Sequence, residues 1–188
     1  LLTRQELLPG IPRPAPGLVI VGSFVPRSTE QLYRLLELDG VCGIELRVVE
    51  VVEGQMREPE IRRVVSAAEE ALRWGQVPVV YTTRRLLAES KEGSVRIGQQ
   101  VACALVEVVK RISLAPKWII GKGGITAHDI AVQALGARRS FTPGQISPGV
   151  PIWMLGEETC FPGLPYVVFP GNVGQPDTLA AVVRLLRG

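Results

Sequence analysis

Three short segments have the residue types and spacing of ligand-binding turns: Gly22-Ser23, the run 121–126, and the run 170–174. Each follows an apolar run that is typical of a buried strand. Glycine lets the backbone approach a ligand closely, and open parallel sheets bind their ligands beyond the carboxyl ends of the strands. The three segments are therefore candidate ligand-binding turns at the carboxyl ends of predicted strands.

The middle segment contains Gly123-Gly124 between a predicted strand and a predicted helix. A glycine turn followed by a helix N-terminus presents free N–H groups and positive potential to a phosphate. Thr126 and Asp129 fit the spacing of an acidic capping box, which predicts that the helix begins at Thr126. On spacing alone, phosphate binding and a plain strand-to-helix turn both remain open.

The last segment contains Gly171, Asn172 and Gly174, which tolerate tight turns and present backbone groups outward. A ligand contact and a simple turn before the final helix are equally compatible with it. The pair Arg84-Arg85 follows another predicted strand, and either an exposed basic turn or a phosphate contact fits it.

Several kinds of site are disfavoured by absent motifs. The phosphate loop G-x-x-x-x-G-K-[ST] does not occur, and neither does the dinucleotide fingerprint G-x-G-x-x-G. His128 is the only histidine of the chain, so no multi-histidine metal site is possible. Cys42, Cys103 and Cys160 are far apart, which predicts neither a zinc site nor a disulfide framework and favours a reducing, cytoplasmic environment.

Composition indicates one globular domain. The chain has 188 residues, of which 46% are hydrophobic and 21% charged, enough to bury a sizeable core. Basic residues are scattered, the net charge is +3 and only 5% of residues are aromatic, so nucleic-acid binding is not expected. No apolar run approaches the roughly 18 residues of a membrane-spanning helix, so no membrane partner is expected.

Apolar periodicity predicts alternating strands and helices, and hence an α/β fold: an open, mostly parallel sheet with helices on both faces. A β-rich extension is expected in the last third, which is rich in glycine and proline. Ser28 and Gln31 fit a capping box that would start the first helix. The predicted strands are residues 18–23, 44–52, 78–81, 118–120, 150–155 and 164–169, and the predicted helices are 28–36, 59–72, 94–113, 126–135 and 176–187.

Residues 1–16 carry four prolines, which favours an extended connector. The chain also begins at Leu1 rather than Met. We therefore expect residues 1–16 to be the remnant of an interdomain linker and the chain to be part of a longer protein.

Taken together and in order, the motifs resemble the four-carbon acid sugar kinase family, and in particular its C-terminal nucleotide-binding domain. The resemblance runs from about Leu18 to the end of the chain. It is carried by Val21-Gly22-Ser23, Tyr81-Thr82-Thr83-Arg84, Lys122-Gly123-Gly124-Ile125-Thr126, Ala134-Leu135-Gly136, Ile146-Ser147-Pro148-Gly149-Val150-Pro151 and Pro170-Gly171-Asn172-Val173-Gly174.

The resemblance implies that residues 17–188 are the ATP-binding domain of a two-domain enzyme, with Mg²⁺ as a cofactor. A separate N-terminal domain would bind a sugar acid such as threonate, erythronate or 3-oxo-tetronate, and would supply the catalytic base. No catalytic residue is therefore assigned here. A homo-oligomer is also compatible with it. The implied nucleotide-binding residues are Ser23, Gly123, Gly124, Ile125, Thr126, Gly171, Asn172 and Gly174.

The chain departs from the family at two positions. Ile125 stands where the family has an acidic residue, and Pro170 stands where it has a serine. Two alternatives to the kinase therefore remain: a non-catalytic nucleotide-binding or regulatory module, which Ile125 favours, and an NAD(P)-dependent oxidoreductase domain, which the missing fingerprint disfavours.

Overall fold

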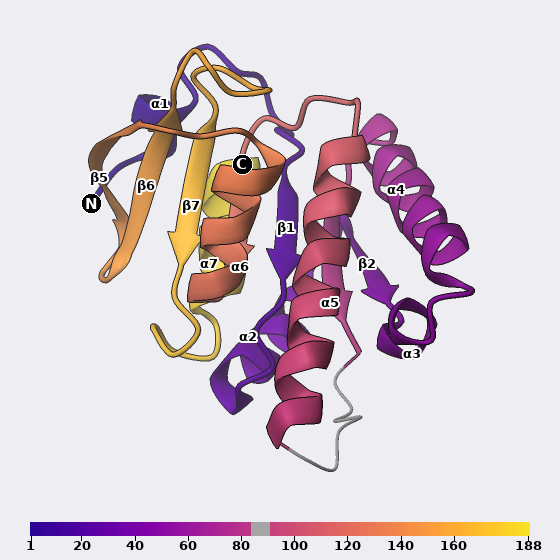
Figure 1. The fold of residues 1–188 in the computed structure, drawn as a ribbon. Helices are drawn as coiled ribbons and strands as arrows, with labels where there is room; N and C mark the ends of the chain where they lie inside the picture. Colours follow the sequence, from indigo (N-terminus) through magenta and orange to yellow (C-terminus); the bar gives the residue numbers. More distant parts are fainter. Residues whose placement is uncertain (84–90) are drawn as a thin grey trace.

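The computed structural model describes residues 1–83 and 91–188, except for the side chains of residues 91–94. Arg84 and Arg85 lie outside the described residues. Seven strands form one sheet (Figure 1). The strands are β1 (Leu18–Val21), β2 (Val41–Leu46), β3 (Val77–Thr82), β4 (Ile119–Lys122), β5 (Ser140–Ser147), β6 (Val150–Leu155) and β7 (Pro165–Phe169).

The sheet has the strand order β2-β3-β1-β4-β7-β6-β5. The first five strands in this order are mutually parallel, and β6 and β5 join them in antiparallel fashion. This confirms the predicted mostly parallel α/β sheet, with antiparallel strands added in the C-terminal third. The parallel strands β1 and β4 are buried along their whole length, as expected for strands covered on both faces.

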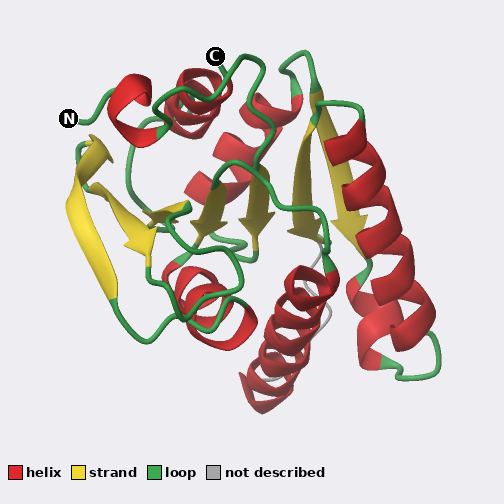
Figure 2. Ribbon diagram, turned by 90° about the horizontal axis from the view of Figure 1, so that it is seen from above, coloured by secondary structure: helices red, strands yellow, loops and turns green. Residues whose placement is uncertain are grey.

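Helices cover both faces of the sheet (Figure 2). One apolar core lies between the sheet and α4, α5 and α6, and a second lies between the sheet and α2 and α7. The helices are α1 (Arg4–Leu7), α2 (Pro26–Leu36), α3 (Val48–Val52), α4 (Arg57–Arg73), α5 (Lys91–Arg111), α6 (Gly124–Asp129), which continues into a π-helical turn (Ile130–Ala134), and α7 (Thr178–Arg187).

The prediction of one strand over 44–52 is wrong in its second half. The strand β2 ends at Leu46, and the valine-rich run that follows forms the short helix α3. Val48 and Val51 are its buried residues, three positions apart. Burial of one helical face therefore outweighs the strand preference of β-branched residues.

The predicted start of the first helix is also wrong. Helix α2 begins at Pro26, with Val25 as its N-cap residue. Proline fits the first turn because the N–H it lacks has no partner there. Ser28 and Gln31 consequently lie inside the helix, where both side chains are fully buried.

The three tryptophans occupy very different environments. Trp118, just before β4, is fully buried and donates a hydrogen bond from Nε1 to the carbonyl of Ala15 at 3.0 Å. A Cβ on Gly17 would lie 2.1 Å from the Trp118 ring, so only glycine fits beneath it. Trp74, at the end of α4, is 77% exposed, whereas Trp153 on β6 packs against the core.

The N-terminal segment packs against the domain. Residues Arg4–Leu7 form one turn of helix rather than extended chain, and Leu7, Leu8 and Ala15 are buried in the second core. Among the described residues, no helix is both long enough and apolar enough to cross a membrane.

Candidate functional site

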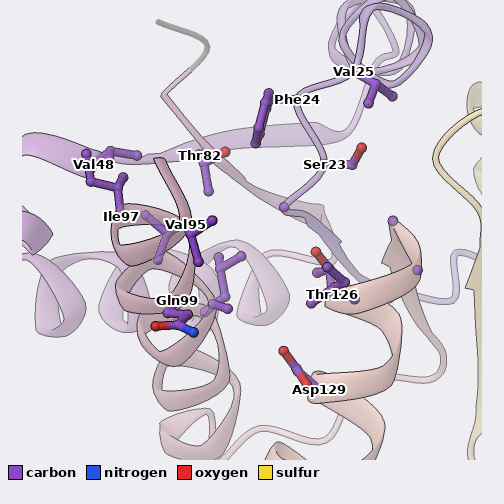
Figure 3. A pocket seen from close by; sticks show the side chains of 18 of the residues that line it. Ser23, Phe24, Val25, Val48, Thr82, Val95, Ile97, Gln99, Thr126 and Asp129 are labelled. Carbon is purple, nitrogen blue, oxygen red and sulfur yellow. The ribbon is translucent and has the colours of Figure 1, made fainter. Parts of the chain in front are cut away.

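A cleft of about 790 Å³ lies beyond the carboxyl ends of β1, β3 and β4. Small-molecule sites usually have volumes of this order. Ser23, Gly123, Gly124, Ile125 and Thr126 all contribute to its lining, so the fold brings five of the predicted site residues together. Figure 3 shows Ser23, Thr126 and Asp129 on one side of the cleft and Val48, Val95 and Ile97 on the other.

The turn from β4 into α6 depends on Gly123. This residue has φ +110°, which other residues rarely adopt, and a Cβ on it would lie 2.8 Å from the Cβ of Ser23. Its N–H donates to the carbonyl of Phe169 at 2.8 Å, which fixes the turn to the neighbouring strand β7. Gly123 is the N-cap residue of α6, so the predicted helix start at Thr126 is wrong and Thr126 lies within the first turn.

The first turn of α6 offers donors to the cleft. The N–H groups of Gly124, Ile125 and Thr126 have no hydrogen-bond acceptor among residues 1–83 and 95–188. Gly124 is exposed, and a Cβ on it would meet no atom within 4 Å. Free N–H groups at a helix start are suited to an anion such as a phosphate.

The loop after β1 lies directly against this turn. A Cβ on Gly22 would lie 2.2 Å from the Thr126 hydroxyl oxygen, so the two loops meet with no room for a side chain at Gly22. Ser23 follows and lines the cleft next to Gly123. The first and second turns are therefore in direct contact.

The other end of the cleft is apolar. Its wall is formed by α5, the start of α3 and Phe24, which is 62% exposed. An apolar surface next to a patch of N–H donors suits a ligand with a flat ring at one end and negative charge at the other. The apolar residues are Phe24, Val48, Val95, Ile97, Val101 and Leu105.

Asp129 is the only charged side chain among the described residues that line the cleft. It lies one turn beyond Ile125 on the same helix, and Gln133 Nε2 donates to its Oδ1 at 3.0 Å. Sequence reasoning treated Asp129 as a helix cap and so missed its position. Asp129 follows Ile125 by four residues. Once the helix is known to begin at Gly124, this spacing places both side chains on the same helical face.

The third predicted segment is a supporting turn beside the cleft. Gly171 lies next to Ser23, since a Cβ on it would lie 3.2 Å from the Ser23 hydroxyl oxygen. Asn172 and Gly174 are exposed and are not among the residues that line the cleft. The structure thus places Gly171 near the other predicted residues but leaves these two apart from them.

Buried polar side chains hold this turn by its carbonyl groups. Ser28 donates to the Gly171 carbonyl at 3.0 Å, and Lys122 Nζ donates to the carbonyls of Pro170 at 2.6 Å and Gly171 at 3.0 Å. Gln31 Nε2 donates to the carbonyls of Val173 and Gln175. We call Ser28, Gln31 and Lys122 the turn clamp. Sequence reasoning missed it, because burial of these polar residues is not visible in the sequence.

Lys122 is fully buried, and its ammonium group lies 4.3 Å from the centre of the Phe169 ring. Burial, with a smaller contribution from the charge of Arg27, lowers the pKa of Lys122 to about 8. Its charge is directed into the turn beyond β7 and does not line the cleft. Lys122 therefore does not contribute its charge directly to the cleft lining.

No group of three or more acidic, histidine or cysteine side chains that could hold a metal ion occurs among the described residues. A metal enclosed by protein ligands alone is therefore not built into the part of the chain described. Magnesium, however, usually binds through one or two carboxylates together with the phosphates of a nucleotide. Asp129 and the Thr126 hydroxyl are compatible with an ion of that kind.

Comparisons with known proteins agree with this geometry. A family model described as the nucleotide-binding C-terminal domain matches residues 18–179. None of the curated proteins compared with this chain matches it.

Solved structures share the fold. One is a Salmonella typhimurium LT2 protein provisionally named a tRNA synthase, with a TM-score of 0.69 and 19% identity over 91% of this chain and 41% of that one. Another is a domain of unknown function from Bordetella bronchiseptica, solved with bound citrate as a domain-swapped dimer, with a TM-score of 0.73 and 22% identity over 94% of this chain and 42% of that one.

The present chain thus spans about two-fifths of the length of these solved proteins. The family match covers most of the chain, and it confirms the resemblance found in the sequence. The chain belongs to the family of nucleotide-binding C-terminal domains.

Proposed function

We propose that this chain is the ATP-binding part of a two-domain kinase that phosphorylates a four-carbon sugar acid. The observation that carries the proposal is the cleft. It combines free N–H groups at Gly124, Ile125 and Thr126 with an apolar wall on α5. Family membership supports a nucleotide as the ligand. In the proposed complex the adenine ring of ATP lies along α5, and the phosphates lie at the start of α6.

Phosphoryl transfer places few demands on the domain that holds ATP. The bond from the γ-phosphorus to the ADP oxygen breaks, and a bond from the γ-phosphorus to the acceptor hydroxyl oxygen forms, while that hydroxyl loses its proton to a base. Catalysis consists mainly of positioning and of stabilising charge. The N–H groups of the α6 turn would contribute both. The catalytic base is assigned to the sugar-acid domain, as the family resemblance implies, and Asp129, on the phosphate side of the cleft, is not given that role.

The remaining parts of the proposal concern the longer protein. Residues 1–16 would be the end of a linker from the sugar-acid domain, lying against the second core. The greater length of the solved proteins of this fold is compatible with such a second domain. The citrate in one of them is a hydroxy acid, as the proposed substrates are, and its dimer is in keeping with a homo-oligomer. The three free cysteines fit a cytoplasmic location.

The substitution Gly124→Val tests ATP binding at the turn. The new side chain has room, because a Cβ on Gly124 meets no atom within 4 Å, but it covers the N–H groups. We expect ATP affinity, measured by isothermal titration calorimetry with Mg²⁺ present, to fall by about tenfold or more, with a melting temperature near that of the wild type.

Gly144→Val on β5 is the matched control. A Cβ there makes only ordinary contact, at 3.4 Å, with the side chain of Leu2, and the position is not part of the cleft. Wild-type ATP affinity is expected for this variant. If the chain fails to bind ATP, or if Gly124→Val binds it normally, the proposed site is wrong.

A second candidate function is a non-catalytic nucleotide-binding module. It is favoured by Ile125, an apolar residue that is 76% exposed at the position where the family has an acid. Kinase activity of the longer protein with a four-carbon sugar acid would exclude this alternative. Binding of ATP without any transfer would support it.

A further inference from the structure

We infer that Asp129 takes the place of the acidic residue that the chain lacks at Ile125, and that it anchors the Mg²⁺ bound with ATP. This inference rests on the proposed function, because it concerns the phosphate end of the same cleft. It also assigns a role to a residue that the sequence motifs did not single out for binding.

The first argument is position. Asp129 follows Ile125 by four residues on one continuous helical stretch, so the two side chains lie on the same face about one turn apart. Both line the cleft, and Thr126 lies between them in the sequence and also lines it. In Figure 3 the carboxylate of Asp129 lies below Thr126, on the side of the cleft formed by α6. The chain therefore has a carboxylate one helical turn beyond the position of Ile125, where the family has its acidic residue.

The second argument is availability. Gln133 donates to Oδ1 of Asp129, whereas Oδ2 has no hydrogen-bond donor among the described residues. No ion pair involves this carboxylate in the same part of the chain, although ion pairs hold many of the other acids. An oxygen is thus left to face the cleft, and the Gln133 contact holds the group in place.

The third argument is charge. Asp129 is the only charged group of the described lining, and it lies within a helical turn of the N–H groups proposed to hold phosphates. A carboxylate beside bare phosphates repels them. A divalent cation between the two converts this repulsion into attraction, and magnesium commonly bridges one or two carboxylates to nucleotide phosphates. The arrangement therefore favours the magnesium complex of a nucleotide over the free nucleotide.

The test compares ATP binding with Mg²⁺ and with EDTA by calorimetry. In the wild type, Mg²⁺ should raise ATP affinity by about tenfold or more. In Asp129→Asn, which keeps an oxygen for Gln133, this enhancement should fall to about threefold or less. Because a negative charge has been removed, ATP affinity in EDTA should rise by about threefold. A variant that was merely damaged would lose affinity under both conditions.

Ile125→Asp gives an independent test, since this exposed position tolerates a polar side chain. Added alone, the new carboxylate should weaken ATP binding in EDTA and enlarge the effect of Mg²⁺. Combined with Asp129→Asn, it should restore the effect. Asp39→Asn is the charge-matched control, because Asp39 is exposed just before the amino end of β2, and it should behave as the wild type.

The outcomes separate the two proposals. If ATP binds neither with Mg²⁺ nor in EDTA, the proposed function fails. If ATP binds and the wild type shows no effect of Mg²⁺, or if Asp129→Asn retains the full effect, the assignment of Asp129 is overturned. An Ile125→Asp variant whose affinities equal those of the wild type also contradicts it.

Discussion

The two glycine turns that follow β4 and β7 look alike in the sequence and differ in the structure. The turn after β4 leaves the N–H groups of Gly124, Ile125 and Thr126 open to the cleft. The turn after β7 has its carbonyls occupied by Ser28, Gln31 and Lys122. One turn offers donors to a ligand, whereas the other has its acceptors satisfied from within. We therefore expect a glycine-rich turn at a strand end to bind a ligand only where its polar groups remain available.

The difference has a cause in how the helices meet the sheet. Helix α6 begins one residue after the end of β4, and its first three residues line the cleft. Helix α7 begins at Thr178, eight residues after Pro170, and the intervening chain needs support. That support comes from polar residues of α2 and β4, which are fully buried. The turn after β4 is nevertheless joined to the end of β7, because the N–H of Gly123 donates to the carbonyl of Phe169.

The largest expected contrast is between Gly22→Ala and Gly171→Ala. A Cβ on Gly22 would lie 2.2 Å from the Thr126 hydroxyl oxygen, whereas one on Gly171 would lie 3.2 Å from that of Ser23. We expect Gly22→Ala to lower the free energy of unfolding by about 1–3 kcal/mol and to weaken ATP binding by about tenfold. Gly171→Ala should change both only slightly. Denaturant unfolding and calorimetry measure these effects, and equal effects at the two glycines would remove the contrast.

Gln31→Leu in the turn clamp should have a similar effect on stability but a much smaller effect on ATP binding. The change leaves the carbonyls of Val173 and Gln175 without their donor, which should lower the free energy of unfolding by about 1–3 kcal/mol. ATP affinity should be nearly unchanged, because the cleft lining is not altered. Ser28→Ala is the matched comparison and should cost less, since Lys122 still donates to Gly171. A large loss of ATP affinity in Gln31→Leu would show that the supporting turn belongs to the site.

The smallest effect concerns Lys122 and pH. Burial lowers the pKa of Lys122 to about 8 from its ordinary 10.5, so the folded chain releases this proton at a lower pH than the unfolded chain does. The free energy of unfolding should therefore rise by about 1–2 kcal/mol between about pH 8 and 9.5. Lys122→Met should lack this rise in urea unfolding curves. Above that range Tyr166 should lower the free energy of unfolding as the pH rises, because burial raises the pKa of its hydroxyl group. If the free energy of unfolding changes equally with pH in the wild type and in Lys122→Met, the lowered pKa of Lys122 is contradicted.

Much of the fold could be predicted because the parallel strands are short apolar runs and the helices have clear apolar faces. Val48–Val52 was misread because its residues prefer strands, and only the tertiary packing of α3 decides otherwise. The predicted helix starts at Ser28 and Thr126 lie two residues too late. Both residues have the spacing of a helix cap, but the helices begin at Pro26 and Gly124.

The lining of the candidate site was predictable where glycines mark it and unpredictable where the direction of a side chain matters. Ser23 and the run 123–126 line the cleft as their motifs suggested. The proposed role of Asp129 depends on the true start of α6, which the capping-box spacing placed at Thr126 instead of Gly124. Gln31 and Lys122 belong to amphipathic or apolar segments in the sequence, and their burial follows only from the position of the turn after β7.

The contrast between Trp118 and Trp74 provides a built-in optical signal. The buried indole of Trp118, which packs on Gly17, emits at shorter wavelength than an indole in water. Its emission should therefore shift to the red when the protein unfolds. Trp74 is already 77% exposed and serves as an internal reference that changes little. None of the three tryptophans is among the described residues of the cleft wall. Intrinsic fluorescence therefore follows unfolding with little direct quenching by a bound nucleotide, and the stability and binding measurements can be made on the same unlabelled chain.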